Sequence, residues 1–227
     1  MITEEPRKNR ISAFDVCDTL YYSNTTHDFI EFVLSREPGS LKKLVYRMLN
    51  SRVLPFRYAF ILINVKLKWD LLREFNISML KGKSRAQLSD LARRFVDEIL
   101  NSKRVAETQA LLRQHVDSGL MVVLCSSSIE PVVSAISEEL GIENYLSTDL
   151  QYKDELFTGK ILNDITYCKA EILHRRYAPN QLAFAVSDNT SDLQLLSEAD
   201  DAVAVVHSVR KEEFWRRHNF KIIRLSS

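Results

Sequence analysis

A carboxylate stands directly after a short apolar run near the start of the chain, where Asp15 follows Ile11–Phe14. A carboxylate at the end of a buried strand is costly unless a charged partner or a metal offsets it. In open α/β sheets, ligands bind outside the carboxyl ends of the strands. A second carboxylate, Asp188, follows the apolar run 184–186. The two segments together predict a Mg²⁺ site with an aspartate nucleophile between them.

The size and composition of the chain fit a soluble globular protein. It has 227 residues, of which 45% are hydrophobic and 27% charged. This length suits one large domain or a core domain with an insertion. The net charge of +1 implies no bulk attraction to nucleic acid or to a membrane. We therefore expect a small-molecule partner and no nucleic-acid partner, while the oligomeric state is not indicated.

Cysteine usage and the apolar segments bear on the compartment. The spacing of Cys17, Cys125 and Cys168 lacks the pairing of a zinc site, so we expect reduced thiols and a cytoplasmic location. No apolar segment follows the polar N-terminus, which argues against a signal peptide. The hydrophobic stretch 58–72 is interrupted by polar residues well short of a membrane span. These interruptions are Asn64, Lys66, Lys68 and Asp70.

Residues 26 to about 118 show helical periodicity almost throughout, after a predicted strand at 11–15. Pro38, Pro55 and Gly82 punctuate the helices. Two amphipathic stripes stand out, and we expect both to face a common core. The first stripe comprises Leu41, Leu44, Val45, Met48 and Leu49, and the second comprises Leu88, Leu91, Ala92, Phe95, Val96 and Ile99.

From Gly119 onward, predicted strands alternate with predicted helices. This alternation favours a Rossmann-like parallel sheet with helices on both faces. We therefore predict an α/β core domain at 1–23 and 105–227, with an all-helical domain inserted at 24–104. The predicted strands are 120–125, 146–152, 155–160, 182–186, 202–206 and 222–225, the second and third forming a pair, and the predicted helices are 130–140, 169–177 and 192–199.

Four polar segments occur in a fixed order along the chain: 14–19 (FDVCDT), 122–128 (VVLCSSS), Lys169, and 187–192 (SDNTSD). In this order they resemble the haloacid dehalogenase-like (HAD) superfamily over about residues 11–23 and 105–225. The helical insertion, Thr158-Gly159-Lys160 and the helix carrying Lys169 resemble the phosphoserine phosphatase-like branch with its helical cap. The resemblance implies a Rossmann-like core, a cap domain and phosphatase activity on a small phosphorylated substrate.

The resemblance also implies a Mg²⁺ site. Asp15 would be both the nucleophile and a metal ligand, since an ionised aspartate can attack phosphorus and form an aspartyl-phosphate. The backbone carbonyl of Cys17 would be a second ligand and Asp188 a third. Asp192 would act on the metal through water or orient other groups. Mg²⁺ prefers such hard oxygen ligands and screens the repulsion between two anions.

The remaining matching residues would hold the phosphate. By resemblance, Ser126 would hydrogen-bond a phosphate oxygen, and Lys169 would pair with Asp15 and with the phosphate charge. Cys17, Ser127 and Asn189 complete the expected substrate-binding residues. Positioning and charge neutralisation of this kind supply most of the catalysis in phosphoryl transfer.

Each of these residues also has an ordinary structural explanation. Asp15 could form a turn, and Asp188 and Asp192 could be a helix cap and a first-turn acid. Ser126–Ser128 could cap the helix that begins near Glu130, and Lys169 could be a solvated helix residue. Only the joint order of the four segments favours the functional interpretation.

The chain departs from the family pattern D-x-D-x-T at Cys17, where the second aspartate would protonate the leaving group. A neutral thiol suits that role poorly. Three explanations are open: Asp18 takes the acid role after a change of turn, the leaving group needs little acid, or the protein is a slow phosphatase or a phospho-ligand binder. Haloacid dehalogenation is a more distant alternative. The segment 21–28 also lacks the glutamate expected for a phosphoserine amine.

Overall fold

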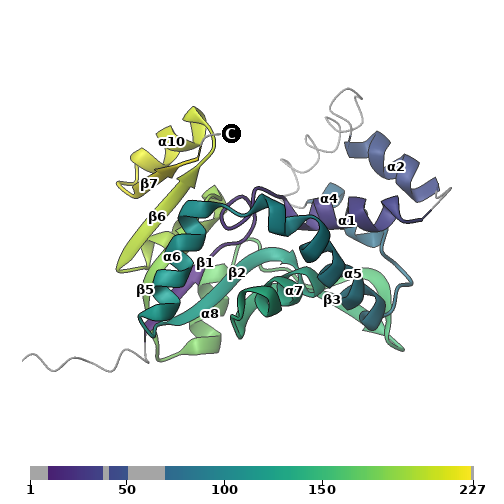
Figure 1. Ribbon diagram of the computed structural model, residues 1–227, viewed down its shortest axis with the longest axis horizontal. Helices are drawn as coiled ribbons and strands as arrows, with labels where there is room; N and C mark the ends of the chain where they lie inside the picture. Colours follow the sequence, from purple (N-terminus) through teal and green to yellow (C-terminus); the bar gives the residue numbers. More distant parts are fainter. Residues whose placement is uncertain (1–9, 38–40, 51–69, 226–227) are drawn as a thin grey trace, which may run out of the picture.

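A seven-stranded sheet forms the centre of the computed structural model, which describes residues 10–37, 41–50 and 70–225 (Figure 1). The strand order is β4-β3-β2-β1-β5-β6-β7, and only β3 and β4 pair in an antiparallel way. Because β1 lies between β2 and β5, three strand ends meet at one edge of the sheet. The strands are β1 (Arg10–Phe14), β2 (Met121–Ile129), β3 (Asn144–Lys153), β4 (Leu156–Asn163), β5 (Gln181–Ser187), β6 (Asp201–Val206) and β7 (Lys221–Arg224).

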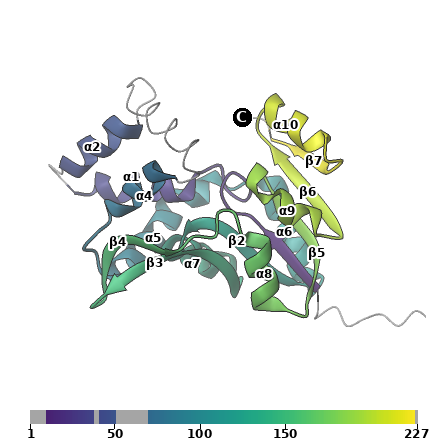
Figure 2. The same cartoon turned by 180° about the vertical axis from the view of Figure 1, so that it is seen from behind.

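Helices cover both faces of this sheet, as predicted (Figures 1 and 2). Alternating side chains of β1 explain the arrangement: Phe14 enters one buried cluster, whereas Ile11 and Ala13 enter another. The first cluster includes side chains of α6 (Ala106–Asp117) and α7 (Glu130–Leu140), and the second includes side chains of α8 (Lys169–Tyr177), α9 (Leu193–Ser197) and α10 (Val209–Arg216).

Two details of this core differ from the sequence prediction. Strand β2 continues to Ile129, so Ser126–Ser128 lie within the strand and not after it. Helix α10 was not predicted, although Ser208 caps it by accepting from the backbone N–H of Lys211. The parallel pairing of β6 and β7 requires a crossover connection, and α10 supplies it.

The second amphipathic stripe faces the core, as expected: four of its six residues are buried, and Leu91 and Ile99 are partly buried against the same cluster. It lies on α5 (Arg85–Glu98), which begins with a reciprocal capping box between Ser84 and Gln87. Phe95 is fully buried and packs edge-on against Phe29 and Phe32 of α1 (Thr25–Ser35), at centroid distances of 5.6 and 5.4 Å. The remaining inserted helices described are α2 (Leu41–Asn50), α4 (Leu71–Ser78) and the short η2 (Leu100–Lys103).

Part of the first amphipathic stripe does not face a core, and the prediction was wrong for that part, whereas Val45 is partly buried and packs against the hydrophobic core. Leu41, Leu44 and Met48 are 73%, 57% and 44% exposed on α2. The buried residue of α2 is Tyr46, whose hydroxyl donates to the carbonyl of His27 at 3.0 Å. Helical periodicity identifies an apolar face, but it does not identify what covers that face.

The inserted helices and the sheet share one hydrophobic cluster, which includes Phe29, Phe95, Phe14 and Val122. The division into domains at 1–23, 24–104 and 105–227 therefore stays a prediction. Pro38, Pro55 and the part of the stretch 58–72 that precedes Asp70 lie outside the described residues. Among the helices that are described, none is both long enough and apolar enough to cross a membrane.

The contrast between the two stripes predicts unequal costs of truncation. Phe95→Ala should lower the free energy of unfolding by about 3–5 kcal/mol, because it leaves a cavity among fully buried rings. Leu44→Ala, on the exposed stripe, should change it by less than about 0.5 kcal/mol. Urea unfolding of both variants measures this difference. Equal losses would contradict the packing described for α2 and α5.

Candidate active site

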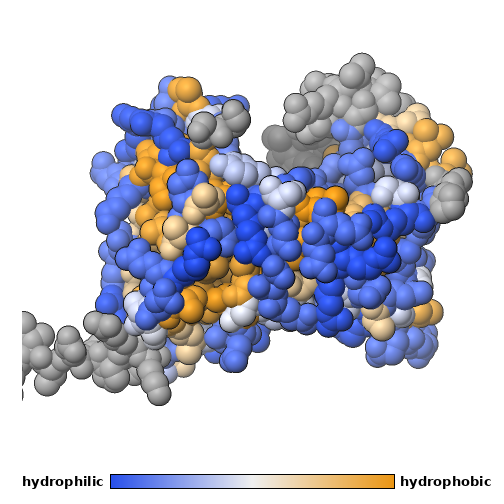
Figure 3. Space-filling model, in the orientation of Figure 1, coloured by the Kyte–Doolittle hydropathy of each residue, from blue (hydrophilic) through white to orange (hydrophobic). Residues whose placement is uncertain are grey.

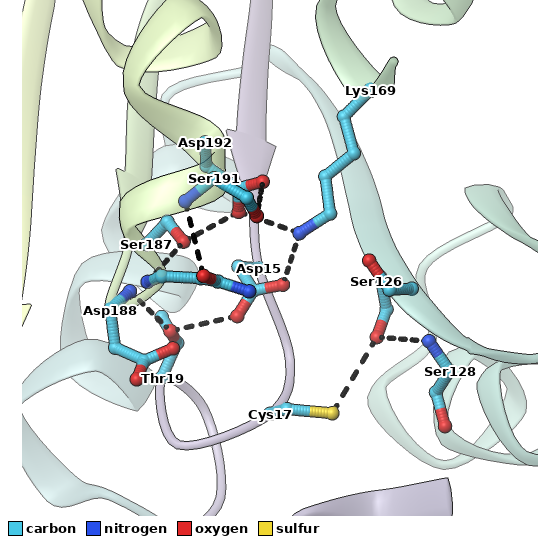
Figure 4. Close-up of polar contacts among 12 residues, drawn as sticks. Asp15, Cys17, Thr19, Ser126, Ser128, Lys169, Ser187, Asp188, Ser191 and Asp192 are labelled. Atoms are coloured by element: carbon cyan, nitrogen blue, oxygen red, sulfur yellow. Dashed lines mark hydrogen bonds and ion pairs between the residues drawn. The ribbon is translucent and has the colours of Figure 1, made fainter. Parts of the chain in front are cut away.

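Asp15 lies at the carboxyl end of the central strand and is 3% exposed. Its backbone N–H donates to the carbonyl of Val186 at 3.0 Å, which fixes its place between β1 and β5. One carboxylate oxygen accepts from the Thr19 hydroxyl at 3.0 Å, and the other accepts from Lys169 Nζ at 2.7 Å (Figure 4). Both oxygens of this carboxylate are therefore held by donors, one from the loop that follows β1 and one from α8.

Lys169 bridges two carboxylates at the start of α8. It is 3% exposed, and its ammonium donates to Asp15 at 2.7 Å and to Asp192 at 2.6 Å. Asp192 also accepts from the Ser187 hydroxyl at 2.6 Å. The alternative explanation of Lys169 as a solvated helix residue is therefore wrong. In this structure Asp192 orients the lysine.

Asp188 joins the same cluster through Thr19, because its backbone N–H donates to the Thr19 hydroxyl at 3.0 Å. Its carboxylate is buried and forms an ion pair with Lys211 of α10. The cap of this turn is Asn189, whose side chain accepts from the backbone N–H of Ser191. Capping therefore does not explain Asp188. Asn189 caps the turn and is also one of the residues that line the cavity at this edge of the sheet, so its predicted role in substrate binding stays a prediction.

The surroundings of Asp15 and Asp188 raise the pKa values of these two carboxyl groups. Burial raises the pKa of Asp15 to about 7, with Asp192 and Asp188 adding to the increase and Lys169 opposing it. Burial also raises the pKa of Asp188, against the attraction of Lys211. Burial would lower the pKa of Lys169, but its two carboxylate partners outweigh that effect and raise it. The cluster contains three carboxyl groups, those of Asp15, Asp188 and Asp192, but only two ammonium groups, those of Lys169 and Lys211.

Cys17 faces a group of hydroxyls, not a carboxylate. Its Sγ lies 3.0 Å from Thr25 Oγ1 and 3.9 Å from Ser126 Oγ. The Thr25 hydroxyl donates onward to Ser128 at 2.8 Å, and Ser126 Oγ accepts from the backbone N–H of Ser128. Burial, followed by the charge of Asp15, raises the pKa of the Cys17 thiol to about 11, so the thiol is neutral near pH 7. Helix α7 has no side-chain cap, which removes the capping explanation of the serines.

A cavity of about 460 Å³ opens onto this cluster. Asp15, Cys17, Lys169 and Asp188 line it from the sheet side, and residues of the inserted helices line the opposite side. Ser127 also lines the cavity, and its buried hydroxyl has no hydrogen-bond partner within the described part of the chain. An unpaired buried hydroxyl at this position suits a ligand oxygen. The lining residues from the inserted segment include Asn24, His27, Asn50, Asp70, Arg73 and Asn76.

Asp18 is placed differently from the other predicted site residues. Of the described residues, those that line the cavity do not include it. Its backbone is left-handed, with φ of 48°, and its carbonyl accepts from His207 Nε2 at 2.6 Å. An acid role for Asp18 would therefore require a change of this turn. Ser126 and Asp192 also lie behind the cavity wall, where each contacts a lining residue.

Sequence reasoning missed three residues of the site. Thr19 occupies the threonine position of the D-x-D-x-T pattern, so the sequence pattern could have indicated its contact with Asp15. Lys211 lies on the unpredicted helix α10, and no sequence pattern indicated a role for it. Arg73 of α4 pairs with Asp164 and donates to the carbonyl of Ser127 at 2.6 Å. Arg73 thus connects α4 to strand β2, a contact that helical periodicity in the sequence does not reveal.

The residues present fit Mg²⁺. Asp15 and Asp188 are buried carboxylates with raised pKa values, linked through Thr19. Among residues 10–37, 41–50 and 70–225, no three His, Cys, Asp or Glu side chains form a metal-binding group. Mg²⁺ commonly takes only one or two carboxylates, with water and substrate oxygens completing its shell. Asp15, Asp188 and the Cys17 carbonyl are the groups that would hold it.

The chain matches the family model of the haloacid dehalogenase-like hydrolases over residues 13–197. It is 28% identical over 166 residues to phosphoserine phosphatase SerB1 of Mycobacterium tuberculosis strain H37Rv. That alignment covers 65% of this chain and 52% of the relative. The chain therefore spans about half the length of the curated relatives it matches.

Solved structures share the fold. A protein of unknown function from Bordetella pertussis Tohama I superimposes with a TM-score of 0.75 and 18% identity, covering 95% of this chain and 98% of that one. A phospho-aspartyl intermediate analogue of phosphoserine phosphatase gives a TM-score of 0.61 and 18% identity, covering 97% and 94%. At this identity the similarity concerns the fold alone.

The buried bridge of Lys169 predicts a pH-dependent loss of stability. Lys169→Met should lower the free energy of unfolding by about 3–5 kcal/mol near pH 8, because two buried carboxylates lose their cation. The loss should shrink near pH 5. A carboxyl group whose pKa is raised in the folded state stabilises the fold at low pH. This stabilisation is lost as the pH rises through the folded-state pKa, which is about 7 for Asp15 even with Lys169 present.

Urea unfolding at both pH values, with chelator present, measures the effect. Lys160→Met is the matched control, because Lys160 is exposed on β4. A loss equal to that of the control, or one independent of pH, would contradict the buried bridge.

Proposed function

The chain belongs to the haloacid dehalogenase-like hydrolases, and from that membership we propose that it is a Mg²⁺-dependent phosphomonoesterase. The proposed substrate is a small phosphorylated metabolite, hydrolysed in the cytoplasm through an aspartyl-phosphate intermediate. The observation that carries this proposal is the bridge of Lys169 between Asp15 and Asp192 beneath a cavity of about 460 Å³. An oriented carboxylate beside a buried cation suits attack on a phosphate ester.

Asp15 is the proposed nucleophile. Thr19 and Lys169 hold its two oxygens, so the carboxylate is oriented before a substrate arrives. Attack on phosphorus would form the bond between Asp15 and the phosphoryl group and break the ester bond to the leaving alcohol, which takes up a proton. Water would then cleave the aspartyl-phosphate, restoring Asp15 and releasing phosphate.

The groups around Asp15 are proposed to hold the phosphoryl oxygens. Lys169 supplies positive charge, and Ser127 lines the cavity and has a buried hydroxyl without a partner among the described residues, which a small side-chain rotation would make available as a donor. Ser126 would act through its contacts with Cys17 and Ser128. A bound Mg²⁺, held by Asp15, Asp188 and the Cys17 carbonyl, would neutralise the charge that the phosphate and the carboxylates place together.

The inserted helices are proposed to act as a cap domain at 24–104 over a core at 1–23 and 105–227. Residues of α2 and α4 line the cavity opposite the aspartates. A cap in that position excludes water and contacts the part of the substrate beyond its phosphate. The lining on that side is mostly polar, as in Asn50, Arg73 and Asn76, which favours a polar substrate.

A second candidate function is a slow or non-catalytic phospho-ligand binder. The neutral Cys17 thiol occupies the position of the expected acid, and Asp18 does not line the cavity. These two observations favour a site that binds phosphate but lacks an effective acid to protonate the leaving group. The two functions differ in turnover and not in binding.

Asp15→Asn should abolish turnover and leave the fold intact, since the amide is nearly isosteric but a poor nucleophile. The assay is a panel of phosphomonoesters with Mg²⁺, beside a phosphate-binding measurement and far-ultraviolet circular dichroism. Wild-type turnover should also disappear with chelator. Turnover of the variant within about tenfold of wild type would rule out Asp15 as the nucleophile. Binding without turnover in the wild-type protein would favour the second candidate.

The acid position predicts a dependence on the leaving group. Cys17→Asp should raise the rate on alkyl phosphates by less than the roughly 10²–10⁴-fold typical of acid catalysis, because the surrounding hydroxyls are not arranged for a carboxyl. p-Nitrophenyl phosphate needs little protonation and should gain least. If Asp18 already acts as the acid, Asp18→Asn should slow alkyl phosphates most and Cys17→Asp should add little. An unchanged leaving-group dependence in both variants would refute both assignments.

A further inference from the structure

Asp188 is a buried carboxylate of the site that Lys169 does not contact. The residue is 5% exposed, and Figure 4 shows its carboxylate directed away from the Lys169 ammonium. Within the part of the chain that the structure describes, Lys211 of α10 is its ion-pair partner. A buried carboxylate without a charged partner is costly. The Lys211 ammonium therefore compensates the charge of Asp188 whenever no other cation does.

Helix α10 is held in the position from which Lys211 reaches Asp188. Trp215 of the same helix is fully buried in the hydrophobic cluster that also contains side chains of β1 and α8. The segment before the helix is held as well, because His207 Nε2 lies 2.6 Å from the carbonyl oxygen of Asp18. These two contacts place the start of α10 against the loop that follows β1, beside the aspartates.

The helix itself gives no reason for a lysine at this position. Helix α10 begins at Val209, so Lys211 lies in the first turn, where the positive end of the helix dipole disfavours a cation. The side chain of Lys211 is 37% exposed, against 3% for Lys169. Figure 3 shows strongly hydrophilic residues at the outer edge of the molecule, where Figure 1 places α10. The ammonium of Lys211 thus has access to water, which gives it room to leave Asp188.

We propose that Lys211 is a built-in counter-ion that competes with Mg²⁺ for Asp188, an inference that rests on the proposed metal site. Asp188 lines the cavity, whereas Lys211 is not among the described residues that line it. The ammonium therefore approaches the carboxylate from outside the cavity. A divalent cation on the same carboxylate would meet the ammonium charge a few ångströms away, where repulsion is strong unless water screens it. Lys211 would thereby raise the Mg²⁺ concentration at which the site is loaded.

Calorimetric titration of the full chain with MgCl₂ at pH 8, without substrate, tests the proposal. Lys211→Met should lower the dissociation constant for Mg²⁺ by at least about tenfold, because the competing charge is removed. Lys211→Arg keeps the charge and should stay within about threefold of the wild-type protein. The matched control is Lys221→Met. It removes an equal charge from an exposed pair with Asp201 and should change the constant by less than about twofold.

Two further variants separate the proposed effect from its alternatives. Lys211→Gln removes the charge with a different side chain and should also strengthen Mg²⁺ binding. Far-ultraviolet circular dichroism of each variant excludes misfolding as the cause of a change. Asp188→Asn tests whether the effect acts through this carboxylate, since adding Lys211→Met to that variant should give no gain in Mg²⁺ binding.

Three results would overturn the proposal: folded Lys211→Met and Lys211→Gln proteins that bind Mg²⁺ no more tightly than wild type, an equal gain in Lys221→Met, or a gain that persists in the Asp188→Asn background. Unchanged Mg²⁺ binding in the Lys211 variants, together with Mg²⁺-dependent turnover in the wild-type protein, overturns this inference alone. A wild-type protein and Lys211 variants that neither bind Mg²⁺ nor turn over phosphomonoesters overturn the proposed function as well.

Discussion

The ion pairs of Lys169 with Asp15 and Asp192 are the interaction on which the site depends. Three segments distant in sequence meet there, and each contributes a group that is almost fully buried. Removing Lys169 would leave two buried carboxylates without their cation, which is far more costly than loss of a surface pair. The strand order β2-β1-β5 brings Asp15 and Asp192 together, because the end of β1, which Asp15 follows, lies beside the end of β5, which leads to Asp192.

Much of this site could be predicted from the sequence, because its main residues stand at strand ends or at a helix start. Asp15, Ser127, Lys169 and Asp188 line one cavity, as their order along the chain led us to expect. Lys211 could not be predicted, since its contact with Asp188 depends on the orientation of α10. Leu41, Leu44 and Met48 of the stripe on α2 were misassigned, because a periodic pattern identifies an apolar face of a helix and not what packs against that face.

The surroundings of Cys17 set the chemical question for this chain. The thiol of Cys17 stands at the position of the second aspartate of the family pattern, and the hydroxyl groups of Thr25 and Ser126 lie beside it, with Ser128 bonded to Thr25. They can hold oxygen atoms, but they are weak acids and bases near pH 7. The proposed site is therefore better equipped to form an aspartyl-phosphate from an activated ester than to protonate a poor leaving group or activate water.

The most direct test of the central claim is the location of the phosphoryl group during turnover. The reaction with p-nitrophenyl phosphate and Mg²⁺ is quenched in acid, and the peptides are examined by mass spectrometry. The account predicts one added phosphoryl group on Asp15, absent from Asp15→Asn and from a sample with chelator. Steady turnover with no phosphoryl group on Asp15, or with one on another residue, would contradict it.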